Sequence, residues 1–320
     1  MNKEKIVLSS THLDSHGVMM TKEALESGAT TINSQRSPRL GLDHDKIFPP
    51  LGRISDAKVV EGKDGEFYLI AYKEFFDKQE YSILDDGTTL YKEYFIDGGK
   101  PFVESEIEPV DKVEIKTDPV NFESKDSLDE FIKDIREDSG FDFDNKQMMR
   151  KSVLPDPEIV VKLTGIIAVT LGIIKSKIAE KVGDAIGEDV ERFYKFIRAC
   201  VIGMVKRAIP INRPITFVFE IHDEVLVEFI IKSNNPDEVV MAFSSSALAD
   251  IQDKIKASKD MFYAEKIQFT FSEQKVWTLN YLLTKDGAVI GTKKAFDKRD
   301  KAYNGLIDKL IERENKNGCS

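Results

Sequence analysis

The pattern of hydrophobic and polar positions changes along this chain. In the first third, short runs of alternating apolar and polar residues are separated by turn residues, which is typical of strands that bury one face. A short helix at 21–28 has Thr21 as its N-cap and Gly28 at its end. The pattern predicts a small β-rich barrel or sandwich over residues 1–123. Its expected strands lie at 4–10, 52–60, 67–72, 91–96, 102–107 and 112–116.

Residues 124–156 contain many acidic residues together with Pro and Gly. We expect an acidic linker there that starts with a short acidic helix, from Ser124 through Ile135, and is otherwise kept extended by its own charge. The next part, residues 157–209, holds an uncharged run at 163–174 and then apolar residues at three- and four-residue spacings. This pattern favours a central helical hairpin, either buried or forming an oligomer interface. The alternative is membrane contact through residues 159–205, although the uncharged run is shorter than the about 20 residues of a bilayer span.

Residues 210–320 predict an α+β domain with an antiparallel sheet. Two alternating strands form a hairpin turned by His222 and Asp223, and a long helix follows at 236–257, with Ser244 to Ser246 on its solvated face. The remaining expected elements are strands at 266–271, 277–283 and 288–290 and a helix at 300–312. The whole chain is therefore expected to belong to the α+β class.

Composition limits the functions that the chain can have. A length of 320 residues suffices for two domains with their own cores, and a net charge of −10 argues against a nucleic-acid partner. The two cysteines, Cys200 and Cys319, are too few for a disulfide framework or a zinc site. The first residues lack the apolar core of a signal peptide, so we expect a cytoplasmic protein, with membrane association only if the apolar helices contact lipid.

The clearest candidate for acid–base chemistry is His44, which lies between Asp43 and Asp45 after a polar loop. The structural alternative is a hydrogen-bonded histidine that stabilises a turn. Two further histidines, His12 and His16, lie upstream, but the short fixed spacing of metal ligands is missing. The sequence therefore predicts neither a metal site nor a cofactor.

Four motifs occur in an order that resembles the phage prohead (capsid maturation) serine protease family, which shares a fold with the herpesvirus assemblins. They are D-x-H-G followed by T-K-E-A-L from Asp14 to Leu25, H-D followed by P-L-G-R from His44 to Arg53, the pair Gly98-Gly99, and V-E-I-x-x-x-P-x-N from Val113 to Asn121. The similarity covers about residues 5–123, just over a third of the chain.

The resemblance implies a serine protease in which His44 is the base and Glu114, on the closing strand, orients it. The segment that matches the family's nucleophile, residues 94–99, contains no serine, and Ser105 is the nearest hydroxyl on an expected strand. Glutamates flank Ser105 and disfavour an alkoxide there. Judged by its apolar neighbours alone, Glu114 would be a solvated strand position.

Two hypotheses follow. In the first, the chain is a degenerate, phage-related or phage-defence protein whose N-terminal domain binds a protein partner, capsid-like or a second copy, while the helical segment mediates oligomerisation or membrane contact. In the alternative, it is an active serine peptidase that cleaves a capsid or self peptide with Ser105, His44 and Glu114. A homo-oligomer is expected in either case.

Overall fold

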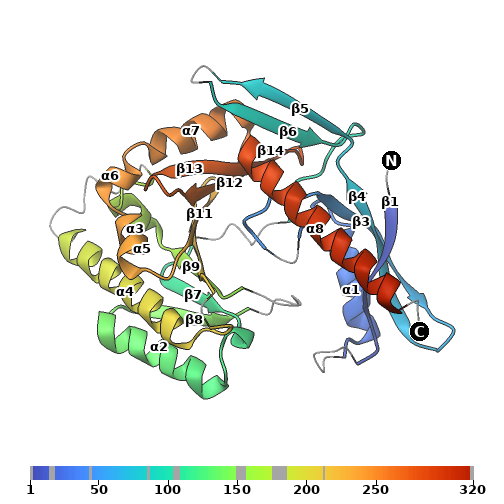
Figure 1. Cartoon of the computed structure of the whole chain (residues 1–320), viewed down its shortest axis with the longest axis horizontal. Helices are drawn as coiled ribbons and strands as arrows, with labels where there is room; N and C mark the ends of the chain where they lie inside the picture. Colours follow the sequence, from blue (N-terminus) through green and yellow to red (C-terminus); the bar gives the residue numbers. More distant parts are fainter. Residues whose placement is uncertain are drawn as a thin grey trace. The chain divides into compact units, whose positions relative to one another are not determined.

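A computed structural model gives the structure of the chain and describes residues 3–13, 19–42, 45–84, 87–103, 109–148, 156–174, 186–211 and 213–317. The chain forms two compact units, unit 1 from Met1–Ser105 and Leu283–Ser320 and unit 2 from Glu106–Leu282. Unit 1 therefore combines both ends of the sequence, and unit 2 is inserted between them. Helices and strands are both abundant in the described residues (Figure 1), which confirms the predicted α+β class.

Unit 1 contains an antiparallel sheet in the order β1-β4-β3-β2. Helix α1 packs on this sheet through Leu25 and Ala29, which contact Leu69 and Ala71 of β4. Thr21 caps α1 by accepting a hydrogen bond from the amide of Ala24, as the sequence predicts. The elements are β1 (Lys3–Ser10), α1 (Lys22–Ile32), β2 (Arg39–Leu40), β3 (Gly52–Glu61) and β4 (Phe67–Phe75).

A second part of unit 1 joins strands from distant parts of the sequence. Strand β6 pairs antiparallel with β5 on one side and with β14 on the other. Helix α8 follows β14 directly, and its Tyr303 packs against Leu40, Leu42 and Leu51 in a small apolar cluster. The elements are β5 (Lys78–Ile83), β6 (Thr89–Tyr94), β14 (Val289–Thr292) and α8 (Lys293–Asn317).

Unit 2 is built around a mixed sheet in which the strands follow the order β13-β12-β11-β10-β9-β7-β8. The predicted hairpin is present as β10 and β11, whereas β9 pairs parallel to β10, β12 parallel to β11, and β8 parallel to β7. The antiparallel sheet predicted for residues 210–320 is therefore correct for β10 and β11 and wrong for β12, which pairs parallel to β11. The strands are β7 (Val113–Thr117), β8 (Phe143–Gln147), β9 (Glu158–Leu163), β10 (Thr216–His222), β11 (Leu226–Lys232), β12 (Ala264–Phe271) and β13 (Trp277–Thr284).

Helices cover one face of this sheet with an aromatic core. Phe243 contacts the rings of Phe193, Phe219 and Trp277, which come from α4, β10 and β13. The indole of Trp277 is fully buried and donates a hydrogen bond to the carbonyl of Ala242. The helices are α2 (Lys125–Ser139), α3 (Gly165–Thr170), α4 (Ile186–Arg207), α5 (Pro236–Met241), α6 (Ser245–Leu248) and α7 (Ile251–Phe262), with a 3₁₀ turn at Pro119–Asn121.

Two expected segments differ from the structure. The short acidic helix predicted at the start of the linker is present as α2, capped by Ser124 and Gly140. The segment is packed rather than extended, because Phe131 and Ile135 bury an apolar face against α4, and strand β8 follows. The predicted central hairpin begins instead with strand β9, whose residues are all buried. A fully buried strand has no polar alternation, so its sequence cannot be distinguished from a buried helix by periodicity.

The predicted long helix of the C-terminal part is divided into α5, α6 and α7, since Ser244 accepts a hydrogen bond from the amide of Ala247 and starts a new helix. Ser244 is therefore an N-cap rather than part of a solvated helix face. The last helix begins at Lys293, earlier than expected. Among the described residues, none of the helices combines the length and the hydropathy that a bilayer span requires.

Candidate functional site

The predicted catalytic residues are only partly described. His44 and Ser105 lie outside the described residues, as does His16. Glu114 is described and lies in β7. The peptidase arrangement of these residues therefore stays a prediction.

Glu114 occupies a buried position, not the solvated one that its sequence neighbours suggest. Its side chain is 11% exposed, and its Oε1 lies 2.6 Å from Nζ of Lys146 on the neighbouring strand β8. Its Oε2 is buried and has no hydrogen-bond partner among the described residues. The carboxylate is thus held by a lysine on one side only, and an unpaired buried oxygen costs free energy.

Glu114 belongs to a row of charged side chains that crosses one face of the unit 2 sheet. It lies opposite Lys162 in the pairing of β7 with β9, and Lys162 lies opposite Glu220 in the pairing of β9 with β10. Positive and negative charges therefore alternate from Lys146 on β8 to Glu220 on β10. Lys162 and Glu220 are 7% and 1% exposed, so the middle of the row is buried, whereas Lys146 at its edge is 56% exposed.

The row continues on the other side of β10. Glu220 lies opposite Glu228 of β11, whose Oε2 accepts hydrogen bonds from Lys266 Nζ at 2.9 Å and from Gln268 Nε2 at 2.8 Å. Gln268 Nε2 is also 3.3 Å from the hydroxyl of Tyr281. Lys266 and Gln268 are 0% exposed. Buried charges are costly unless they are paired, and Glu228 and Lys266 meet this requirement. The face also concentrates ionisable groups, as functional sites often do.

His222 closes the row at the end of β10. The sequence suggests an ordinary turn residue, but the imidazole is 1% exposed and its Nε2 lies 3.4 Å from Oε2 of Glu220. Its Nδ1 is buried and has no partner in the part of the chain that the structure describes. A second unpaired polar atom therefore lies on this face.

Lys116 is a further lysine of this face, and its pKa is lowered. It lies on β7 opposite Lys146 of β8 and Val160 of β9, on the same face of the sheet as Lys162. Burial lowers the pKa of Lys116, and the charge of Lys162 lowers it further, while Glu220 and Glu114 partly oppose this shift. The Lys116 side chain is only partly buried. It is therefore an accessible amine whose proton is held less firmly than that of an ordinary lysine.

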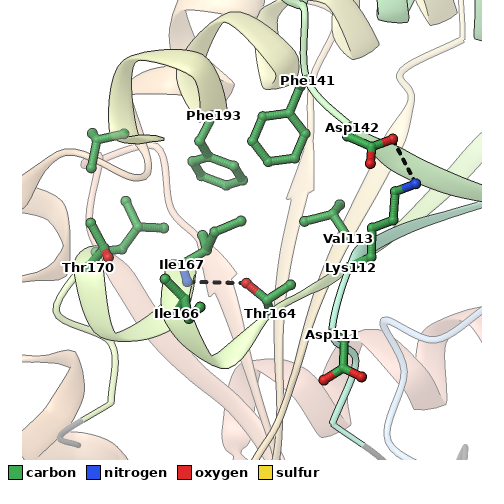
Figure 2. Close-up of a pocket in the computed structure, with 12 residues that line it drawn as sticks. Asp111, Lys112, Val113, Phe141, Asp142, Thr164, Ile166, Ile167, Thr170 and Phe193 are labelled. Carbon is green, nitrogen blue, oxygen red and sulfur yellow. Dashed lines mark hydrogen bonds and ion pairs between the residues drawn. The ribbon is translucent and has the colours of Figure 1, made fainter. Parts of the chain in front are cut away.

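A pocket of about 250 Å³ opens at another edge of unit 2, between α3, α4 and the start of β7. Figure 2 shows the rings of Phe141 and Phe193 on one side and Ile166 and Ile167 on the other. Lys112 lies at one end and is paired with Asp142 at 2.7 Å. The pocket has the size for a small apolar molecule, and the carboxylate of Asp111 also lines it.

Unit 1 contains a different surface feature at strand β5, which forms the end of its sheet. All six residues of β5 are exposed, and Tyr81 and Ile83 are 68% and 66% exposed. Large apolar side chains on an unpaired sheet edge are unusual, because such edges readily bind further strands. Sequence reasoning did not predict this strand.

Several residues of the family-like motifs have structural roles in unit 1. Arg53 donates from Nε to Glu74 at 2.6 Å and lies over the ring of Phe95. Gly98 has a φ of +86°, and a Cβ on Gly99 would lie 2.1 Å from the carbonyl oxygen of Asp286. These motif residues are explained by packing, independently of any catalysis.

Metal binding finds no support in the described part of the chain. Within the described residues, no group of three or more His, Cys, Asp or Glu side chains is arranged to bind a metal ion. His12 lies 3.5 Å from Asp64 and beside the ring of Tyr68, a surface cluster with a single carboxylate.

Sequence reasoning singled out Glu114 but missed Lys116, Lys162, Glu228 and Lys266. Lys162 and Glu228 alternate with apolar neighbours, while Lys116 and Lys266 each have one polar neighbour, and both patterns are typical of a strand with one solvated face. A charged residue within a strand that is otherwise strongly apolar, such as Lys162 in β9 or Glu228 in β11, was the available signal.

Comparison of the chain with family models, with curated proteins and with solved structures finds no match.

Proposed function

We propose that the chain is a non-catalytic protein-binding protein, and that unit 1 binds an extended segment of a protein partner as an added strand beside β5. The observation behind this proposal is the complete exposure of β5 at the end of its sheet, with Tyr81 and Ile83 outward. Strand addition uses the main-chain groups of an open edge for affinity and its side chains for specificity.

The backbone of β5 has the geometry that strand addition requires. The amide of Leu84 donates to the carbonyl of Thr88, and hydrogen-bonded pairs alternate along an antiparallel ladder. The main-chain groups of Ser82 and Glu80 therefore point toward β6. Those of Tyr81 and Ile83 point to the open edge, where a partner strand would pair with them.

The side chains of β5 define the chemistry of the partner. Gln79, Tyr81 and Ile83 share one face, and Tyr81 packs against Tyr91 on β6. Lys78 and Glu80 lie on the other face. A matching segment would have apolar residues at alternate positions on the first face and would place a carboxylate near Lys78 and a cation near Glu80.

The resemblance to prohead proteases fits this proposal because such a domain handles polypeptide segments, and the missing serine at 94–99 explains why binding would persist without cleavage. The alternative is the active peptidase with Ser105, His44 and Glu114.

A peptide selection tests the proposal. A phage-displayed library of seven-residue peptides is selected against the full-length protein, and the affinity of enriched peptides is measured by fluorescence anisotropy. Ile83→Ala removes the side chain, whereas Ile83→Pro also removes the outward amide without breaking the ladder to β6. We expect Ile83→Pro to weaken binding about ten-fold beyond Ile83→Ala, since it removes a main-chain hydrogen bond.

Other outcomes contradict the proposal. Equal binding by the two Ile83 variants, or no enriched peptide, would exclude strand addition at β5. A dimer that light scattering detects in the wild type and not in Ile83→Pro would identify a second copy as the occupant in place of a foreign partner. Cleavage of an enriched peptide, with labelling by a fluorophosphonate that Ser105→Ala abolishes, would establish the peptidase instead.

A further inference from the structure

We infer that the pocket between α3, α4 and the start of β7 binds a small amine with an apolar body, such as an arylalkylamine or a branched alkylamine. This pocket lies within unit 2, and ligand binding there is independent of strand addition at β5 in unit 1. Its walls supply an apolar, partly aromatic surface, and one side of it carries more carboxylates than cations.

The floor of the pocket is apolar and buried. Phe193, Val113 and Ile167 line it, and each of them is at most 9% exposed. Ile166 also lines the pocket but is 58% exposed, so a large apolar side chain is left uncovered where the pocket meets solvent. A ligand with an apolar body would remove this side chain and the floor beside it from water, which the hydrophobic effect favours.

The volume of the pocket limits the ligand to a small molecule. A space of about 250 Å³ is smaller than most sites for drug-sized ligands and suits one aromatic ring with a short side chain. Phe141 and Phe193 lie on one side of this space and Ile166 and Ile167 on the other (Figure 2), so a ring or a branched alkyl group would contact both sides.

The charges beside the pocket favour a cation as the polar end of the ligand. Asp111, Lys112 and Asp142 lie together on the side where β7 begins (Figure 2). Nζ of Lys112 is 2.7 Å from Oδ1 of Asp142 and 3.3 Å from Oδ1 of Asp144, so this ammonium already has two carboxylates. Three carboxylates against one ammonium leave this side negatively charged, which attracts a ligand cation and repels an anion.

Asp111 is the carboxylate that is best placed to pair with the ligand ammonium. It lines the pocket and is exposed, whereas Asp142 and Asp144 share Lys112. Within the part of the chain that the structure describes, Asp111 forms no ion pair, so a ligand would not have to displace another cation. The ammonium of a ligand would therefore lie at Asp111, with the apolar body between the phenylalanine and isoleucine side chains.

Three compounds of similar shape and different charge provide the probes. 2-Phenylethylamine is cationic at pH 7, 2-phenylethanol is neutral and 3-phenylpropanoate is anionic. Their binding to the full-length protein is measured by ligand-observed NMR titration. We expect a Kd of about 0.1 to 1 mM for the amine, binding of the alcohol that is about three-fold weaker or more, and no binding of the carboxylate. Added salt should weaken binding of the amine and not that of the alcohol.

Two pairs of variants locate the binding. Asp111→Asn keeps the shape of the side chain and removes its charge, so it should weaken binding of the amine about three-fold and leave that of the alcohol unchanged. Asp260→Asn, at an exposed position of α7, should change neither. Ile166→Ala should weaken binding of both compounds. Ile202→Ala is its control, because Ile202 of α4 is 48% exposed and does not line the pocket.

All four positions are exposed, so the variants should fold, and circular dichroism checks this. Amine binding at this pocket is excluded if the alcohol or the carboxylate binds as tightly as the amine. It is also excluded if Asp111→Asn or Ile166→Ala binds the amine as tightly as its control variant, or if none of the three compounds binds.

Discussion

Arg299 and Glu93 form a buried, two-pronged ion pair within unit 1, although 206 positions separate them in the sequence. The Nη1 and Nη2 atoms of Arg299 lie 2.6 and 2.9 Å from the two oxygens of Glu93. Nη1 also donates to the carbonyl of Pro50 at 2.9 Å, and the Arg299 side chain is only 4% exposed. One guanidinium thus connects α8, β6 and the loop before β3.

Removing one partner of this pair should be costly. Arg299→Met leaves the Glu93 carboxylate and the Pro50 carbonyl without their donor, and we expect unfolding free energy to fall by about 3 kcal/mol in urea denaturation. Glu93→Gln should cost less, because an amide still accepts one hydrogen bond. The double variant should lose less than the sum of the single losses, and strict additivity would show that the two residues do not interact.

Glu74 should make unit 1 sensitive to acid. Burial alone would raise its pKa, but hydrogen bonds from Lys3, Ser55 and Arg53 outweigh burial and lower the pKa to about 2. A carboxyl group with a lowered pKa stabilises the fold above its unfolded value of 4.5, and that contribution disappears as the pH falls toward 2. We expect this loss to be about 2 kcal/mol.

Urea midpoints measured from pH 6 to about pH 2.5 test this effect. Glu74→Gln provides the control, because it cannot titrate. The wild type should be the more stable protein at pH 6, and its advantage should shrink as the pH falls. An advantage that is constant with pH would show that Glu74 does not titrate with the lowered pKa.

Gly203 permits close packing of α4 on α2. A Cβ at this position would lie 2.7 Å from the ring of Phe131, which is fully buried. Gly203→Ala should therefore destabilise the protein by about 1–3 kcal/mol, despite the better helix propensity of alanine. Phe131→Leu in the same chain should recover part of the loss.

Gly305 of α8 provides the matched control, since a Cβ there meets nothing within 4 Å. Gly305→Ala should stabilise the protein by up to about 1 kcal/mol in the same thermal or urea experiment. If Gly203→Ala also stabilised the protein, the close contact between α2 and α4 would be wrong.

Cys200 should be chemically inert in the native protein. It is 2% exposed in α4, and burial raises the pKa of its thiol far above the ordinary range. In a Cys319→Ser variant, where Cys200 is the remaining cysteine, we expect Ellman's reagent to release no thiolate until urea unfolds the chain. A fast reaction under native conditions would contradict the buried position.

The hairpin of β10 and β11 could be predicted because both strands alternate around a short polar turn. Strand β9 could not, because Ile159, Val160 and Val161 are buried on both faces and leave no alternation. In α2, the i, i+3, i+4, i+7 spacing of Leu128, Phe131, Ile132 and Ile135 agrees with the predicted short helix, but the high charge of the segment favoured a solvated linker and gave no sign that this face is buried.

The row of charged side chains on the unit 2 sheet shows a stronger limit of prediction from sequence. Lys162, Glu220 and Lys266 come from strands that are far apart in sequence, and only the strand order brings them to one face. Their neighbours in sequence suggest solvated positions, whereas the pairing of β7 with β9 and of β9 with β10 determines which charges meet. Long-range strand order is not encoded in local periodicity, so this feature required the structure.

The inserted arrangement of the units affects how the protein is made. Ribosomes synthesise β1 to β6 first, but β14 and α8 come from the segment after unit 2. At ordinary translation rates, the 177 residues from Glu106 to Leu282 take about 10 to 35 s to synthesise. During that interval Glu93 has no guanidinium to bind, and the nascent N-terminal strands must be protected from aggregation, whereas unit 2 can already fold.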